Sequence, residues 1–151
     1  MVILYYFLWL TQYTNIRKLV IKNNNVEQGL NVENNCYLNN CYSLTCNNNK
    51  LTSLPVLPKC KALYCDYNKL TSLPVLPNCR ALLSCSYNNL TTLPEIPKCE
   101  ILHCSHNNLT ILPNIPNCKV LYCYDNNLTS LPDIPKCTIL WVFLILLYYR
   151  S

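Results

Sequence analysis

The sequence predicts a solenoid, which is a stack of short coils that share one parallel β-sheet and contain little helix. Three features predict it. One phrase occurs in five complete units of nearly constant length, cysteines recur in register, and a pair of prolines closes each unit. A unit this short cannot bury its own apolar residues, so each copy must bury them against the next. We therefore expect one continuous apolar column through all the coils.

Cysteine marks the register of the repeat, whose consensus is C-x-x-L-x-C-x-x-N-x-L-T-x-L-P-x-(L/I)-P-x. Successive units have the same length, except that the third is longer by a single position. Its extra residue falls between Arg80 and Ser84, where we expect a local bulge. The units begin at Cys41, Cys60, Cys79, Cys99 and Cys118, and a sixth start follows at Cys137.

This consensus resembles the leucine-rich-repeat signature L-x-x-L-x-L-x-x-N-x-L, with cysteine at the first and third apolar positions. The resemblance covers Cys41 to about Leu140. The trailing L-P-x-(L/I)-P is similar to short repeats of bacterial effector proteins delivered into host cells, and to repeat proteins of large DNA viruses of amoebae. The resemblance implies a right-handed, curved solenoid with a parallel sheet on its concave side, usually used to hold another protein.

The residues support this architecture independently. Because side chains alternate along a strand, Leu102 and Cys104 should point inward while Ile101, His103 and Ser105 face out. An asparagine follows each strand at the turn, where its amide can donate to and accept from backbone groups of neighbouring coils. These predicted ladder residues are Asn49, Asn68, Asn88, Asn107 and Asn126.

Prolines define the return half of each coil. In the fourth unit, Pro113 and Pro116 fix the backbone angle φ and remove two backbone donors, which excludes a helix there. All ten prolines of the chain fall in this frame. The convex side should therefore be extended, near polyproline II, and poor in helix.

The two ends depart from the repeat. Val2–Leu10 and Ile139–Tyr149 are apolar runs of nine and eleven residues, shorter than the ~20 residues that a spanning helix needs. They could be caps of the stack, a partial membrane anchor at 139–149, or out-of-frame or truncated sequence. The expected organisation is an apolar segment 1–15, a degenerate leading repeat with an Asn-rich loop 16–40, five repeats 41–137, and an apolar cap or tail 138–151.

The twelve cysteines are best explained as core thiols, since free cysteine packs as a small hydrophobe. Two cysteines five positions apart on one strand lie more than ~13 Å apart, too far to share a metal or a disulfide. Disulfides between neighbouring coils stay open as an alternative, and would need an oxidising compartment. The first fifteen residues lack a charged region and a cleavage site typical of a secretory signal. We therefore expect a cytoplasmic protein, in the host cytoplasm for a viral or effector protein, or otherwise a membrane-associated one.

We expect no catalytic, metal or cofactor site. Cys123-Tyr124-Asp125 is similar to the C-x-D motif of a ubiquitin-ligase domain that some bacterial effectors append to such repeats, but Cys123 occupies the inward position of every unit. His103 and His106 are three residues apart on a strand and do not converge. The net charge of +5 comes from cations spread singly along the sequence, without the continuous positive track that nucleic-acid binding requires.

The outward positions of the sheet carry many aromatic side chains, which furnish protein-binding surfaces at low entropic cost. Tyrosine also suits a β-surface, and it shares A/T-rich codons with asparagine and lysine, so composition is the competing explanation. We predict a non-enzymatic scaffold that binds a protein partner on the concave sheet. The alternatives are membrane-associated display of the repeats and the substrate-recognition part of a ubiquitin-ligase or effector system. The predicted partner-binding residues are Tyr64, Asp66, Tyr67, Tyr87, His103, His106, Tyr122, Tyr124, Asp125 and Trp141.

Overall fold

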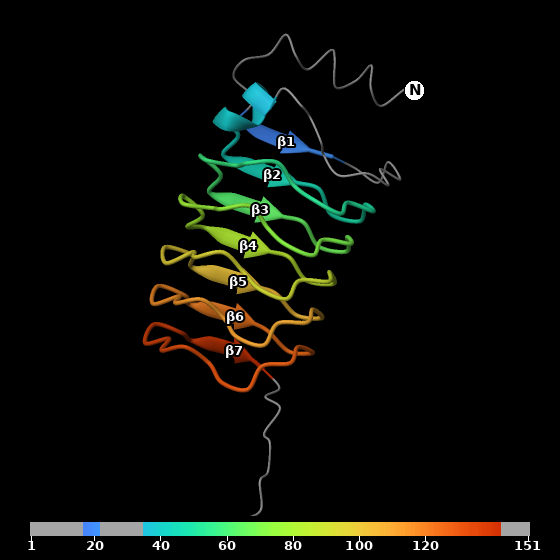
Figure 1. Ribbon diagram of the computed structural model, residues 1–151. Coiled ribbons are helices and arrows are strands. Elements are labelled where there is room, and N and C mark those ends of the chain that lie inside the picture. Colours follow the sequence, from blue (N-terminus) through green and yellow to red (C-terminus); the bar gives the residue numbers. More distant parts are fainter. Residues whose placement is uncertain (1–16, 22–34, 143–151) are drawn as a thin grey trace, which may run out of the picture.

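The computed structural model describes residues 17–21 and 35–142, and these form a parallel-stranded solenoid with almost no helix, which confirms the predicted fold class (Figure 1). Seven three-residue strands stack in chain order, each paired in parallel with the next. One short 3₁₀ helix, η1 (Asn35–Asn40), precedes the second strand. The strands are β1 (Lys18–Val20), β2 (Ser43–Thr45), β3 (Ala62–Tyr64), β4 (Leu82–Ser84), β5 (Ile101–His103), β6 (Val120–Tyr122) and β7 (Ile139–Trp141).

The core is a column of leucines that the strand register aligns. The central residues of β2 to β6 pair with one another from coil to coil, and all five are fully buried. Cysteines flank them before and after in each coil, and Leu57, Leu76, Ile96 and Ile115 close the column from the return segments. Burial of this apolar surface stabilises the stack by ~25 cal/mol per Å². The continuous apolar column predicted from the repeat is therefore present.

Asparagine side chains join the coils at the turn after each strand. The Asn107 amide donates to the carbonyls of Cys104 in its own coil and Cys85 in the preceding one, at 3.1 and 3.0 Å. Its carbonyl oxygen accepts from the Leu90 N–H at 3.0 Å. Asn68, Asn88 and Asn126 make the same contacts in their coils. The predicted ladder thus satisfies backbone groups that the short strands leave unpaired.

The extra residue of the third unit lies just before β4. The N–H groups of Arg80 and Ala81 both donate to the Lys61 carbonyl, at 3.2 and 3.0 Å. Regular units make the same pair of bonds, as Lys119 and Val120 do to the Glu100 carbonyl. The difference appears at the thiol: that of Cys79 contacts the carbonyl three residues on, at 3.5 Å, whereas that of Cys99 contacts the Ile101 carbonyl, two residues on, at 3.1 Å. The irregularity therefore lies in the loop, and β4 keeps the length of the other strands.

The eleven cysteines from Cys41 to Cys137 are free thiols, ten of them buried and Cys137 partly exposed. Burial raises the pKa of Cys46 and of Cys123 to about 12, because the apolar surroundings disfavour a thiolate. The same cause raises the pKa of Cys65, Cys85 and Cys104 well above the ordinary value. These thiols are neutral core residues, as expected from the repeat.

The ends of the stack differ from its centre. β1 lies in the leading segment and pairs with β2 across Leu19 and Leu44. At the other end, Leu140 occupies the inward position of β7 but is 44% exposed. The predicted apolar segment 1–15 and residues 143–151 of the predicted cap lie outside the described residues.

Candidate functional site

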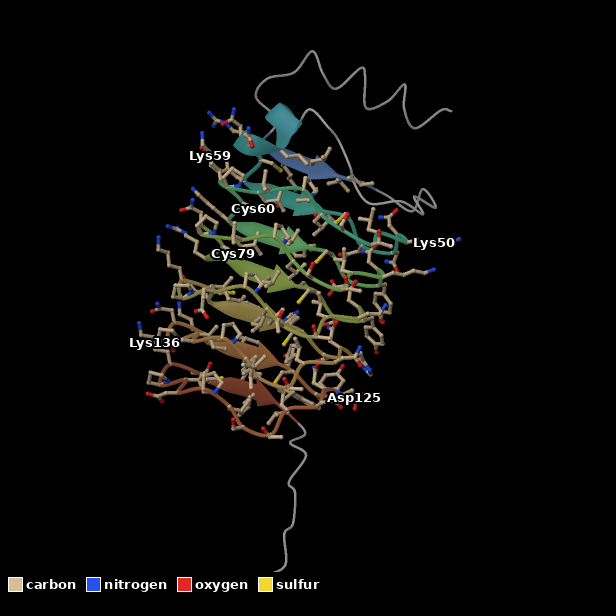
Figure 2. All side chains as sticks on the ribbon, in the orientation of Figure 1. Lys50, Lys59, Cys60, Cys79, Asp125 and Lys136 are labelled. Carbon is tan, nitrogen blue, oxygen red and sulfur yellow. The ribbon has the colours of Figure 1, made fainter. Side chains whose placement is uncertain are left out.

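The outer face of the sheet and the turn beside it carry the ten predicted partner-binding residues in three parallel columns. The strand register places Tyr64, Ser84, His103, Tyr122 and Trp141 in one line, the strand-end column. Two residues later comes a middle column that includes Asp66 and Tyr124. The turn column contains Asn48, Tyr67, Tyr87, His106 and Asp125, and Asp125 marks its edge of the molecule in Figure 2.

Residues of the turn column all adopt left-handed backbone angles. Their φ values lie between 51° and 56°, a region that costs most residues roughly 1–2 kcal/mol and that asparagine and glycine tolerate best. Each turn is held by the next coil: the Tyr67 N–H donates to the Ser86 carbonyl and the Tyr87 N–H to that of Ser105, both at 3.0 Å. The turn therefore dictates the conformation, whichever side chain it carries.

Side chains of the turn column stack on one another. The rings of Tyr67 and Tyr87 lie 4.2 Å apart and 9° from parallel, and the His106 ring lies 3.9 Å from Tyr87 at 21°. Tyr124 meets His106 edge-on at 5.1 Å. The His106 Nδ1 lies 3.2 Å from Asp125 Oδ2. Tyr67 is 50% exposed and Tyr87 39%, so the stack presents an ordered aromatic strip to solvent.

The strand-end column forms a second aromatic group. His103 packs against Tyr122 at 4.6 Å, and Tyr122 meets Trp141 edge-on at 6.4 Å. Burial lowers the pKa of His103, although the charge of Asp66 opposes the shift. The imidazole is therefore largely neutral at pH 7 and packs as an aromatic ring.

Two serines on this face are buried, Ser84 and Ser105, although alternation along the strand predicts that Ser105 faces out. Ser84 is 6% exposed, and its hydroxyl donates to the Asp66 carboxylate at 2.8 Å. Asp66 also accepts the Ser86 N–H at 2.8 Å. Ser105 is 2% exposed, and its hydroxyl has no hydrogen-bond partner among the described residues. Alternation along the strand predicts which face a side chain takes, and it does not predict how deeply a short side chain is buried on that face.

In the described part of the chain, no group of three His, Cys, Asp or Glu side chains is placed to hold a metal ion. His103 and His106 contact different rings in different columns. Within residues 17–21 and 35–142, no helix is long and apolar enough to cross a membrane.

The cations, in contrast, are not dispersed as the sequence suggested. Repeat spacing brings Lys59, Arg80, Lys98, Lys119 and Lys136 to the edge where the strands begin, and four of them line one depression. Residues that are one or two whole repeats apart in the sequence become near neighbours in a stack. Writing the sequence with one repeat per row would have aligned most of these cations, which a linear inspection missed.

No family model matches this sequence, and no curated protein matches it either. Solved structures do. YopM, a leucine-rich effector protein from Yersinia pestis, aligns with a TM-score of 0.64 and 25% identity over 80% of this chain and 41% of its own. YopM from Yersinia enterocolitica WA-314 aligns with a TM-score of 0.71 and 27% identity, over 85% of this chain and 30% of its own.

The leucine-rich-repeat domain of a Shigella effector aligns with a TM-score of 0.69 and 34% identity, over 77% of this chain and 52% of the domain. The chain thus spans between about a third and a half of the length of these proteins.

Proposed function

We propose that this leucine-rich-repeat protein, which resembles the repeat domains of bacterial effectors, binds a protein partner through the outer face of its sheet. The binding surface comprises the stacked turn column and the aromatic strand-end column. The fold supports a protein-interaction scaffold in general. No enzymatic role is part of the proposal, and the effector neighbours favour the cytoplasm of a host cell.

The observation that carries this proposal is the choice of side chain at the left-handed turns. Asparagine is the cheapest non-glycine residue there, the chain contains 22 of them, and Asn48 occupies the position in the first repeat. The next two repeats nevertheless carry Tyr67 and Tyr87, and the fourth carries His106, which tolerates these angles better than tyrosine does. Codon bias explains tyrosine as well as asparagine, but it does not explain why the costlier residue stands at the strained position.

The surface also has the physical character of a binding site. Stacking fixes the rings before any partner arrives, so less side-chain entropy is lost on binding. Exposed phenol hydroxyls and the Asp125 carboxylate offer hydrogen bonds at the edge of an apolar strip. Two alternatives stay predictions: that residues 139–149 attach the repeats to a membrane, and that the repeats recognise substrates for a ubiquitin-ligase or effector system.

The test replaces the exposed rings by the residue that the turn prefers. Tyr67→Asn with Tyr87→Asn should leave the fold intact, because asparagine suits the left-handed angles. The control is Thr71→Asn with Thr91→Asn, which adds two asparagines to the same coils at exposed positions away from the strip. Each chain, immobilised, is exposed to host-cell cytosol, and captured proteins are identified and their affinities measured.

A partner that binds the unaltered chain and the threonine control should lose at least about tenfold in affinity for the tyrosine variant, because exposed aromatic anchors dominate such interfaces. Equal capture by all three chains would remove the aromatic strip from the binding site. A melting curve of the tyrosine variant separates loss of the surface from loss of the fold.

A further inference from the structure

A second surface runs along the edge where the strands begin, on the side of the molecule opposite Asp125. We call it the basic rim, and it consists of residues immediately before and after each unit-start cysteine. Figure 2 shows Lys59 and Lys136 on this edge, with Lys50 and Asp125 on the other. Six exposed cations make up the rim: Lys59, Lys61, Arg80, Lys98, Lys119 and Lys136.

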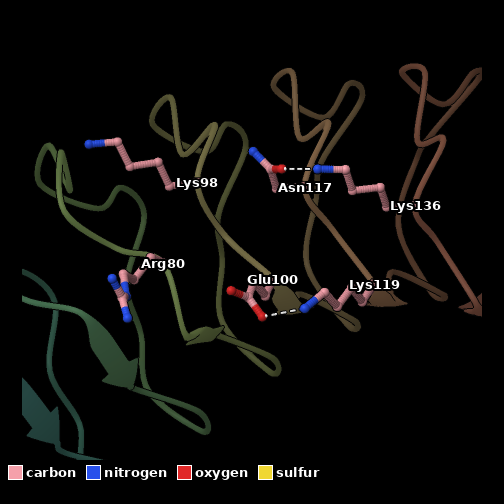
Figure 3. Close-up of a pocket in the computed structure, with 6 residues that line it drawn as sticks. All are labelled: Arg80, Lys98, Glu100, Asn117, Lys119 and Lys136. Atoms are coloured by element: carbon pink, nitrogen blue, oxygen red, sulfur yellow. Dashed lines mark hydrogen bonds and ion pairs between the residues drawn. The ribbon is translucent and has the colours of Figure 1, made fainter.

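The centre of the rim is hollowed into a depression of about 390 Å³ (Figure 3). Four cations and one carboxylate line it together with Asn117. Lys119 donates to Glu100 at 2.8 Å, and Lys136 donates to the Asn117 side-chain oxygen at 2.6 Å. These contacts hold two of the ammonium groups over the depression.

Glu100 does not neutralise this depression. The hydrogen bond from Lys119 lowers the pKa of Glu100, and the charges of Lys119, Arg80 and Lys136 lower it further. The carboxylate therefore stays ionised, yet one negative charge faces four positive ones. Lys98 forms no hydrogen bond or ion pair with any described residue. Glu95 and Asp133 lie on the return segments of the third and fifth units. Within the described chain, neither carboxylate forms an ion pair with a rim cation.

We propose that the basic rim binds an extended acidic segment of a protein partner, with carboxylates entering the depression between Arg80 and Lys98. The guanidinium of Arg80 can bind a carboxylate through two parallel hydrogen bonds, and Lys98 supplies an unpaired positive charge beside it. The rim crosses five coils spaced ~4.8 Å apart, so it extends for roughly 19 Å. An extended peptide covers this length in about six residues.

Other polyanions fit the rim less well. Single-stranded nucleic acid is bound by charge together with aromatic platforms for the bases. Among the described residues next to a unit-start cysteine, the aromatic one is Tyr42, and Lys61 covers its ring at 4.8 Å. A bilayer presents a flat surface, whereas Glu100 and Asn117 direct two of the cations over a recess. A flexible chain can enter that recess.

The proposal concerns a different surface from the aromatic strip, so the two can fail separately. Its test measures fluorescence anisotropy of a labelled hexaglutamate peptide with the full chain at low salt, and hexaglutamine as the neutral comparison. Two further probes are an oligothymidylate and vesicles containing phosphatidylserine. The rim variant is Arg80→Gln with Lys98→Gln. The control is Lys50→Gln with Lys69→Gln, which removes the same charge from the opposite edge.

We expect hexaglutamate to bind and hexaglutamine not to bind. The rim variant should weaken hexaglutamate binding at least about fivefold, since two charged contacts are lost, while the control changes it less than about twofold. Equal losses in both variants would reduce the effect to net charge and overturn the site. Tighter binding of oligothymidylate or of the vesicles than of hexaglutamate would overturn the proposed partner. Arg80, Lys98 and Lys69 are exposed and Lys50 is partly exposed, so melting curves of both variants are measured to separate loss of charge from loss of the fold.

Discussion

Replacing Asn107 by alanine should destabilise the stack more than any surface substitution of similar size. The side chain makes four hydrogen bonds, to the carbonyls of Cys85, Cys104 and Ser105 and from the N–H of Leu90, at 3.0 to 3.2 Å. Alanine removes all four and leaves a buried N–H without a partner. The amide has two hydrogens for its three carbonyl acceptors, so the side chain counts as about three full hydrogen bonds. With ~1 kcal/mol net for each bond and at least ~1 kcal/mol for the orphaned buried donor, the expected loss is about 4 kcal/mol.

The matched control is the next residue. Asn108 is exposed, and in the ladder only its backbone N–H is used, donating to the Leu90 carbonyl at 2.8 Å. Asn108→Ala should therefore change the free energy of unfolding by less than about 0.5 kcal/mol. Urea unfolding followed by circular dichroism measures both, and with a slope of ~2 kcal/mol per molar the Asn107 variant should lose about 2 M in its midpoint. Two variants within about 1 kcal/mol of each other would refute the ladder as a source of stability.

Three further outcomes are expected. Burial raises the pKa of Cys46 and Cys123 from 9.0 to about 12. The stability that these two thiols contribute to the folded state is therefore complete below pH 9 and is lost as the pH rises toward 12. The free energy of unfolding in urea should fall by up to ~1.4 kcal/mol per pH unit for each thiol above pH 9, and a double Cys→Ala variant should fall less steeply; parallel curves would contradict this. Burial lowers the pKa of His103, so the stability contributed by its neutral ring is lost as the pH falls below about 6.5. In the same titration, His103→Gln should make the free energy of unfolding fall less steeply below this pH. Deleting Ala81, the exposed extra loop residue, should leave the melting temperature nearly unchanged, because it restores the regular unit length. Deleting Leu102 from the regular fourth unit should unfold the coil, because it shifts the register by one residue and reverses the faces of β5. Equal melting temperatures of the two variants would show that the insertion is not confined to the loop.

Most of the architecture could be predicted because each unit repeats the same pattern of apolar, turn-forming and proline residues. Leucine and cysteine at alternate strand positions, asparagine at the turn and paired prolines in the return segment fix one coil, and the constant spacing fixes the next. The burial of Leu63, Leu102 and their equivalents follows from this pattern. So does the hydrogen bonding of the ladder asparagines.

The surface was harder to predict, because it depends on contacts between coils rather than within one. Ser84 and Ser105 alternate correctly along their strands but are buried, and Ser84 is hydrogen-bonded to Asp66 of the preceding coil. The stacking of Tyr87 on Tyr67 and His106 follows from the left-handed turns. These turns were hard to predict because no glycine marks them in the sequence. The basic rim was missed since its cations are far apart in the sequence.

The most direct test is a map of thiol reactivity in the native chain. Iodoacetamide labelling followed by peptide mass analysis reports each cysteine separately. Cys65, Cys85 and Cys104 should stay reduced and unlabelled until the chain is unfolded, because they lie fully buried in the apolar column, and burial keeps them as thiols by raising the pKa of each. Labelling of these residues in the native chain as fast as in urea, or their recovery as disulfides, would contradict a dry column of thiols and leucines with the aromatic strip left outside it.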